Sequence, residues 1–482
     1  MSGIALHEKR LRAAQFQFIF PFSLDHNCQD KLERELLTDG FVSFSLQQEE
    51  LESAFYGSGC EVSHRRLEKF FLPFAKNMIF PRQPDAHAFR RYSKRIDLPC
   101  RMTANEHHWR FHLHAADMFV CPFDIGFLTL RVELTDGGEP AFTFSQALAF
   151  ASRFRMLQSM NEAERNIRIG AADCESEEVE DFIFKTVVPA LTRFLDESDL
   201  EESFFEKLPY FVDERMYVQG LLAFERQEEI TTVDAYRASR LDGMDDRGRP
   251  YVSACNTAYI ERFCSERIYD RWSPETWYMI EETSFVCLTR QSGHRVKQLV
   301  SHIYGEYYYA LLINLFHKIV LLKLSNRYSH VQIDKDPDKI EKLIRDITTF
   351  SSKNFFIEAV SQSQGKDMYV RLRERLGIET LYGDVKRTLD DLFKYEENFA
   401  AKRSNYLLLI LTIYTVVSGI FGMNLVVEDL KEPTDLSRFA NYSAFQYMAL
   451  LVAMTGIAVA FGLGIVTIVR LVREWRKSRL ER

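Results

Sequence analysis

Two long uncharged runs near the C-terminus interrupt an otherwise mixed pattern of hydrophobic and polar residues. Ser404–Val427 holds 24 residues without a charge, and Phe439–Val469 holds 31 more. A helix needs about 20 consecutive apolar residues to cross a bilayer. Buried helices of globular proteins are usually shorter and carry charges on one face. The pattern therefore predicts two transmembrane helices, at about residues 404–427 and 440–469.

The charges that flank the two runs predict their orientation. Lys402 and Arg403 precede the first run, and a basic tail with six Lys or Arg residues and two acids follows the second. Because positively charged flanks remain in the cytoplasm, we expect both termini inside and the acidic loop 428–438 outside. The sequence thus predicts a multi-pass protein of the cell membrane, inner or plasma, with roughly 400 residues in the cytoplasm.

Residues 1–290 mix the strand and helix patterns that are typical of an α/β domain. Residues 128–135 alternate, with Leu and Val on one face and Thr129, Arg131 and Glu133 among the residues on the other. Strict alternation over about four to eight residues predicts a strand that contributes a different chemistry to each face of a sheet.

Other segments predict helices and one loop. Helical patterns occur near residues 143–168 and 178–195. The polar, turn-prone stretch 226–250 predicts a loop or an internal joint. Residues 307–317 form an uncharged run of 11 residues. That run is too short to span a bilayer, so it predicts a helix buried in the protein.

Residues 106–114 also alternate, and their polar face carries most of a histidine cluster. These histidines are the strongest metal-binding candidates outside the transmembrane region: His107, His108, His112 and His114. Imidazoles two residues apart on a strand face can bind Zn²⁺ or Ni²⁺. Because Arg110 lies among them and repels a cation, the alternation favours a polar, partly exposed strand face over a metal site.

After about residue 290 the chain changes to long segments without clustered Pro or Gly. These predict helices at residues 294–331, 336–363 and 378–424. The last segment runs directly into the first predicted span, and its 47 residues would extend about 70 Å, so it projects into the cytoplasm as a stalk. We therefore expect a cytosolic α/β domain (1–290), a helical stalk with the cytoplasmic part of the pore helix (291–403) and a transmembrane hairpin with a basic tail (404–482).

The first predicted span ends in Gly422-Met423-Asn424, and here the sequence resembles the CorA family of magnesium channels and transporters. That family carries Gly-Met-Asn at the outer end of the first of two C-terminal transmembrane helices. The large cytosolic domain, the long pore helix, the acidic outer loop and the basic tail are similar too. The resemblance covers about residues 378–482. It implies flux of Mg²⁺ or another divalent cation, a Gly-Met-Asn selectivity filter, gating by the cytosolic domain and no enzymatic activity.

A periodic seam precedes the motif. Stepping back from Gly422 by alternating three and four residues gives mostly small or polar side chains: Gly419, Thr415, Thr412, Leu408, Asn405, Ala401 and Asn398. A 3.5-residue repeat is expected where parallel helices surround an axis, so the seam is predicted to line the pore, with Leu408 as an apolar constriction. The opposite positions suit lipid: Leu407, Ile410, Ile413, Tyr414 and Val417. The resemblance matches Thr415 and Gly419 to pore positions and Asn398 to a ring near the cytoplasmic mouth.

The chemistry of the motif agrees with this resemblance. Mg²⁺ is a hard cation that prefers oxygen ligands and dehydrates reluctantly. Gly422 exposes a backbone carbonyl, and Asn424 offers a neutral amide oxygen, so rings of such groups select an ion without trapping it. Glu428 and Asp429 would concentrate cations at the outer mouth, or are ordinary solvated loop acids. We expect Mg²⁺ as the transported and regulatory ion, and no organic cofactor.

One pair of helices cannot enclose a conduction path, so a homo-oligomeric ring is expected, and the resemblance implies a homopentamer. The other expected partners are the lipid bilayer and divalent cations. Net charge is −8, which argues against nucleic acid as a partner. In the family, cytosolic carboxylates sense Mg²⁺. The acids that would do so, or that are simply solvated, are Asp173, Glu175, Glu177, Glu178, Glu180, Asp181, Glu197, Asp199, Glu201 and Glu202.

Other sequence signals are negative. The eight cysteines contain no Cys-x-x-Cys pair, and such scattered residues predict reduced thiols rather than a zinc ribbon. Gly57-Ser58-Gly59 lacks the Lys-Ser/Thr of a phosphate-binding loop. The N-terminus lacks the apolar region of a signal peptide.

Two alternatives to a magnesium channel remain open. The first is a ligand-gated membrane effector channel of a bacterial defence system, opened by an unknown nucleotide. The unfamiliar N-terminal domain favours it, as do Ser404 and Thr412, which stand where family members carry a bulky apolar gate. The second is a non-conducting, membrane-anchored binding module, against which the motif and the small-residue seam argue.

Overall fold

The computed structural model describes most of the N-terminal region and the long helix that follows it. The described residues are 4–83, 85–104, 107–135, 142–157, 167–171, 174–196, 215–245, 247–331 and 337–422, with scattered residues between 443 and 462. The chain divides into two compact units, residues 1–389 and 390–482. The mixed α/β architecture expected for the N-terminal part is confirmed, because one large sheet is combined with long helices.

Among the described residues of the first unit, 11 strands form a single mixed sheet. Its order is β7-β6-β3-β4-β5-β1-β8-β11-β10-β9, and β2 pairs with β3. The neighbouring strands are antiparallel except for β8 and β11, which are parallel. The strands are β1 (Leu11–Ser23), β2 (Val42–Ser43), β3 (Arg90–Ala104), β4 (His107–Cys121), β5 (Ile125–Leu134), β6 (Ile167–Ala171), β7 (Cys174–Ser176), β8 (Tyr217–Phe224), β9 (Tyr269–Ser273), β10 (Thr276–Ile280) and β11 (Ser284–Thr289).

Helices form many of the connections between the strands and most of the chain after the last strand. They are α1 (Gln29–Thr38), α2 (Leu51–Ala54), α3 (His64–Phe70), α4 (Pro73–Ile79), α5 (Phe144–Phe154), α6 (Val179–Asp181), α7 (Thr232–Arg240), α8 (Thr257–Arg267), α9 (His294–Tyr304), α10 (Glu306–His330), α11 (Pro337–Thr349), α12 (Ser363–Arg375) and α13 (Ile378–Gly422). Short π and 3₁₀ turns follow α6 and α11. The strands predicted at 128–135 and 106–114 are confirmed, within β5 and β4.

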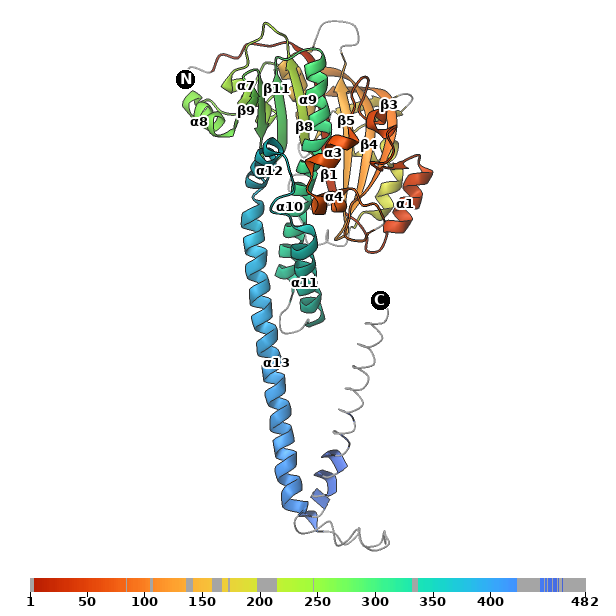
Figure 1. Cartoon of the computed structure of the whole chain (residues 1–482), viewed down its shortest axis with the longest axis vertical. Coiled ribbons are helices and arrows are strands. Elements are labelled where there is room, and N and C mark those ends of the chain that lie inside the picture. The colour runs from red at the N-terminus through yellow and green to blue at the C-terminus, as the bar shows by residue number, and fades with distance from the viewer. Residues whose placement is uncertain are drawn as a thin grey trace. The chain divides into compact units, whose positions relative to one another are not determined.

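Both faces of the central strands are covered by helices. On one face α5 packs against the sheet, where the ring centroids of Phe18 and Phe154 lie 4.6 Å apart. On the other face lie α9 and α10 (Figure 1), and the Tyr308 hydroxyl of α10 donates a hydrogen bond to Thr129 of β5 at 2.8 Å. The polar face of β5, which carries Thr129 and Arg131, is therefore buried as well.

Helix α10 is the buried helix that its sequence predicts. All residues from Glu306 to His317 are buried. Within the part of the chain that the structure describes, one helical stretch is long and apolar enough to cross a membrane, His294–His330, and 83% of its most apolar window is buried inside the protein. That stretch is made of α9 and α10, which cover the sheet.

The prediction of a loop or internal joint at 226–250 is wrong, because this stretch contains helix α7. Thr231 and Asp234 form a capping box, in which each side chain accepts a hydrogen bond from the backbone of the other residue. Arg237 is buried, and its guanidinium donates to the Ser145 hydroxyl at 2.6 Å and to the Gly243 carbonyl at 2.9 Å. The polar composition that indicated a loop is thus satisfied by a helix cap and by tertiary hydrogen bonds.

Helix α13 is continuous over 45 residues, from Ile378 to Gly422. It includes the charged stalk sequence and most of the first predicted span, as the long apolar and polar pattern indicates. The boundary between the two compact units falls within it, after Leu389. Most of the second predicted span lies outside the described residues, so the transmembrane hairpin stays a prediction.

Candidate functional site

The predicted pore seam lies entirely on α13. The described seam side chains are all exposed in the single chain: Asn398, Ala401, Asn405, Leu408, Thr412, Thr415 and Gly419. In a straight helix a 3.5-residue seam drifts by about 20° per heptad. The seam therefore stays on one side of α13 over its three heptads, and a slight supercoil would align it fully with a central axis.

The apolar residues of α13 are exposed on every side of the helix, not only away from the seam. Tyr406, Leu408, Leu411 and Ile413 are 69%, 58%, 63% and 54% exposed. A helix that is apolar all round is covered in its working state by lipid or by other protein chains. Within the described residues, no other part of the chain covers these four side chains.

Two threonines give the seam oxygen acceptors. The hydroxyl of Thr412 donates to the Leu408 carbonyl at 2.7 Å, and that of Thr415 donates to the Leu411 carbonyl at 2.7 Å. Each hydroxyl hydrogen is thereby used within the helix, and the oxygen lone pairs remain available to a cation or its water shell. At Gly419 an added Cβ would meet no atom within 4 Å, so the seam is open there.

Tyr414 contacts a second helical segment of the chain. Its hydroxyl donates to Thr455 Oγ1 at 3.4 Å, and its ring lies 3.3 Å from the position that a Cβ on Gly456 would occupy. The expectation that Tyr414 faces lipid therefore needs correction, because a glycine on the second segment leaves room for the ring.

The Gly-Met-Asn motif begins where α13 ends. Gly422 is the last residue of the helix, so the carbonyls of the final turn have no partner within the helix. These carbonyls are also the negative end of the helix dipole, which attracts cations. The remaining predicted residues of this region lie outside the described residues: Met423, Asn424, Glu428 and Asp429.

The acidic runs proposed as ion sensors are only partly described. Asp181 pairs with Lys185 one helical turn away, at 2.8 Å. Asp173 and residues 197–202 lie outside the described residues. Among the residues that the structure describes, one group of three His, Cys, Asp or Glu has ligand atoms close enough to share a metal ion, and it contains none of these acids.

That group joins Asp97 of β3 to His112 and His114 of β4, with all ligand atoms within 4.8 Å of one another. The polar face predicted for this strand is confirmed, since His108 and Arg110 are exposed and His112 and His114 are half-buried. Asp97 was missed, because nothing in the sequence indicates which residue of a neighbouring strand lies beside a histidine.

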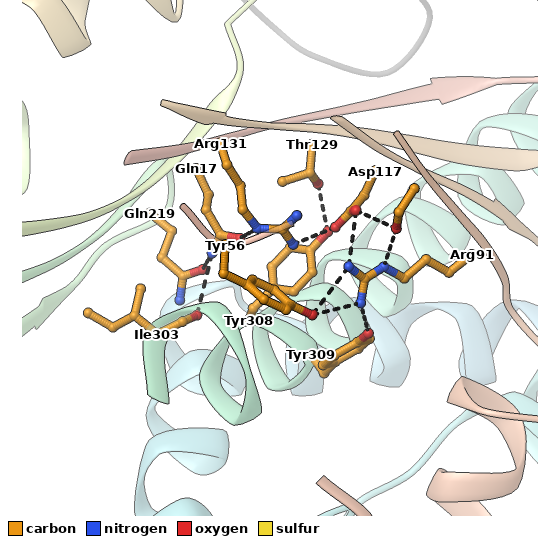
Figure 2. Close-up of polar contacts among 11 residues, drawn as sticks. Gln17, Tyr56, Arg91, Asp117, Thr129, Arg131, Gln219, Ile303, Tyr308 and Tyr309 are labelled. Carbon is orange, nitrogen blue, oxygen red and sulfur yellow. Dashed lines mark hydrogen bonds and ion pairs between the residues drawn. The ribbon is translucent and has the colours of Figure 1, made fainter. Parts of the chain in front are cut away.

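A buried ionic network fixes α10 to the sheet (Figure 2). Asp117 of β4 lies between two guanidiniums, at 3.0 Å from Nη2 of Arg91 and in direct contact with Arg131. The hydroxyl of Tyr309 accepts a hydrogen bond from Arg91. Ser93 also donates to Asp117, at 2.7 Å. Two cations and one anion are thus enclosed between the sheet and α10.

The protonation state of this network follows from its charges. Burial alone raises the pKa of Asp117, but the guanidiniums of Arg131 and Arg91 outweigh burial and leave the pKa below its ordinary value. Burial and the nearby Asp117 charge raise the pKa of the Tyr308 hydroxyl, which stays protonated. The sequence carried one signal of this network, Arg131 in the middle of an alternating strand.

Comparisons of the chain with protein-family models, with curated proteins and with solved structures found no match. The functional assignment therefore depends on the residues and geometry described above.

Proposed function

We propose that this chain is one subunit of a membrane channel that conducts divalent cations, with Mg²⁺ as the first candidate. The observation that carries the proposal is the composition of α13. One continuous helix begins charged, is uncharged from Ser404 to its end, exposes apolar side chains on every side and ends at the glycine of Gly-Met-Asn. A helix with these properties suits a pore wall surrounded by lipid and sister helices.

Conduction would use oxygen atoms rather than charged side chains. The seam offers the hydroxyl oxygens of Thr412 and Thr415, and the end of α13 offers backbone carbonyls. Rings of neutral dipoles bind a cation strongly enough for entry and weakly enough for exit. Asn424 would complete the outer ring with amide oxygens, which a hydrated Mg²⁺ can contact without losing its water shell.

The channel would be a ring of identical chains in the cell membrane, five by the resemblance to the CorA family. In this ring the seam of each α13 faces the axis, and the exposed residues of its other sides face lipid or neighbouring helices. Leu408 is the bulkiest side chain of the seam and would form the apolar constriction.

Contacts at the start of α13 support gating by the first unit. The guanidinium of Arg373, in α12, binds Glu379 of α13 at 2.6 Å and the Phe356 carbonyl at 2.8 Å. Its Nη1 also lies 3.4 Å from Nδ1 of His317 in α10. One buried arginine therefore links α13 to the helices that cover the sheet, and a rearrangement there would be transmitted to the pore helix.

The ligand-gated effector is the second candidate, because a cavity beside the sheet carries charged side chains. A cavity of about 240 Å³ is lined by Arg12 and Lys297 together with Glu133. Cations in a recess would favour an anionic ligand such as a nucleotide. The two candidates share the same pore and differ in what opens it.

The test is Mg²⁺ flux into liposomes that contain the purified full-length chain. We expect flux that falls as Mg²⁺ rises on the side of the sheet unit. Asn424→Ala should reduce the flux by at least about tenfold, since it removes one oxygen per subunit from the filter. The matched control is Asn441→Ala, the same change in the second predicted span.

Each outcome decides between the candidates. Equal flux in the wild type and in Asn424→Ala would refute the filter assignment. A wild-type channel that conducts only after a nucleotide is added would favour the ligand-gated effector. An inert chain under both conditions would favour a non-conducting anchor.

A further inference from the structure

A cavity of about 590 Å³ opens where β3, β4 and β5 meet the loop after α2. Its lining brings together side chains that bind metals: Cys60, Asp97, His112, His114 and Glu133. Arg110, which argued against a metal site in the sequence, is not among the lining residues. In the sheet it pairs with Arg101 of β3, away from Asp97.

Two irregularities of strand pairing create this arrangement. Between β3 and β4 the register shifts from Arg95 to Leu98, so Ile96 and Asp97 together oppose the single residue His114. Between β4 and β5 the register shifts from Leu113 to Ala115, so His114 has no partner there. Bulges redirect side chains, and they are frequent beside functional sites. Here two bulges coincide at one histidine.

Backbone conformation supports the same positions. Asp97 has φ +55°, in the left-handed region that L side chains rarely adopt. Gly57 has φ +86°, and a Cβ there would lie 3.0 Å from Nε2 of His114. The glycine therefore lets the loop after α2 close over the imidazole. Two spatial neighbours of His112 and His114, Gly57 and Asp97, therefore have unusual backbone conformations. Such conformations persist where the surrounding structure fixes them.

The three donors are close enough to converge on one ion. His112 Nε2 lies 2.7 Å from Asp97 Oδ1, and the rings of His112 and His114 are 4.8 Å apart. Ligands of a transition metal lie about 2.0–2.2 Å from the ion, so neighbouring donors are roughly 3–3.5 Å apart. Small rotations of side chains that are already in contact would reach this geometry.

Neighbouring groups complete the site. Glu133 binds Nε2 of His114 at 3.0 Å and accepts a hydrogen bond from Gln15 at 3.2 Å, so it holds the imidazole in place. Carboxylates commonly orient metal-bound histidines in this way. Arg95 binds the other oxygen of Asp97, Oδ2, at 2.9 Å. It therefore neutralises part of the negative charge without occupying the side that faces the histidines.

We infer that Asp97, His112 and His114 bind a divalent transition-metal ion, with open coordination positions that face the 590 Å³ cavity. Two imidazoles and one carboxylate suit Zn²⁺ or Fe²⁺ better than Mg²⁺, which prefers an all-oxygen shell. Three protein ligands leave room for water or an anionic ligand on the ion. This site is independent of the proposed pore.

The experiment measures Zn²⁺ and Co²⁺ binding to the purified full-length chain in detergent. We expect one tightly bound Zn²⁺ per chain in the presence of excess Mg²⁺, and a visible absorption band when Co²⁺ replaces it. His112→Gln and His114→Gln should each weaken Zn²⁺ binding by more than about tenfold. His108→Gln, on the exposed part of the same strand face, is the matched control and should bind like the wild type.

Controls separate this site from the pore and from misfolding. Asn424→Ala should keep full Zn²⁺ binding even where it abolishes flux. Each variant is compared with the wild type by circular dichroism. A folded wild type that binds no Zn²⁺ in excess Mg²⁺ would overturn the inference, as would His108→Gln losing as much affinity as His112→Gln.

Discussion

Helix α10 and the distal part of α13 are both long and apolar, but within the described residues only α10 is buried by the rest of the chain. Every residue from Glu306 to His317 is buried between the sheet and its neighbouring helices. In α13, by contrast, Tyr406 and Leu411 are 69% and 63% exposed. The two helices are therefore similarly apolar in sequence, and they differ in whether other parts of the protein cover their side chains.

The polar groups of the two helices show the same contrast. In α10, the ring nitrogen Nε2 of His317 is bonded to the Asn354 carbonyl at 2.8 Å, which is a tertiary contact. In α13, the hydroxyls of Thr412 and Thr415 donate to carbonyls of their own helix. The two threonines of α13 are satisfied within their own helix, as lipid requires, whereas His317 of α10 depends on its protein surroundings.

Among the substitutions that test this comparison, Asp117→Ala is expected to lower the free energy of unfolding most. The substitution leaves Arg91 and Arg131 buried without their anion beneath α10, which destabilises a fold by about 3–5 kcal/mol. Urea unfolding in detergent would measure it by tryptophan fluorescence, because Trp109, Trp272 and Trp277 are three of the four tryptophans and precede residue 390.

The control for this prediction is Asp270→Ala, which removes an exposed carboxylate of β9. It should shift the urea midpoint little, as most exposed substitutions do. A wild-type midpoint in Asp117→Ala would mean that the buried network does not hold α10 on the sheet.

A matched pair of leucines tests the contrast directly. Leu312→Ala in α10 removes a fully buried side chain and should lower the free energy of unfolding by about 2–5 kcal/mol. Leu411→Ala makes the same chemical change at an exposed position of α13 and should change it by no more than about 0.5 kcal/mol. Similar losses in the two variants, measured by urea unfolding, would contradict the difference in burial.

The last prediction concerns the pH dependence of stability, which the buried histidines on the α10 side control. Burial, with Arg373 adding to it, lowers the pKa of His317 to about 3, and burial beside Arg66 lowers that of His302 to about 3. Unfolding restores the ordinary value near 6.5. The contribution of these histidines to the free energy of unfolding is thus fully present above about pH 6.5. It is lost as the pH drops towards 3, by up to about 1.4 kcal/mol per pH unit for each histidine.

Urea midpoints between pH 7.5 and pH 5 would measure this dependence. His317→Gln should reduce the slope, because the variant has no proton to gain at this position on unfolding. His108→Gln, at an exposed position, should keep it. A wild-type slope in His317→Gln would show that other groups control acid stability.

The sequence predicted elements where local pattern and local environment agree. Alternation located β4 and β5, and the length of the apolar run identified α10 as a core helix. It failed at α7, where a capping box and the buried Arg237 stabilise a helix in a stretch of polar composition. The composition of a polar stretch does not show whether its side chains find hydrogen-bond partners elsewhere in the fold.

The candidate sites divide in the same way. The seam of α13 could be predicted because every member lies on one helix, where spacing alone determines the face. The group of Asp97, His112 and His114 could not, because it depends on two strand bulges that shift the pairing by one residue. Register is decided by how neighbouring strands pack and not by either strand alone.

By itself the sequence determined the mixed α/β character, the long helix α13, the small and polar seam and the Gly-Met-Asn motif. The helices predicted at 294–331 and 336–363 are interrupted, at Gly305 and after Thr349. Only the tertiary structure decided which apolar helix is covered by the chain, and which polar residues meet across strands. The physical reason is range: helix and strand periodicity are set by neighbours along the chain. Burial of Arg131 beside Asp117, or contact of His112 with Asp97, depends on how separate strands align in the sheet.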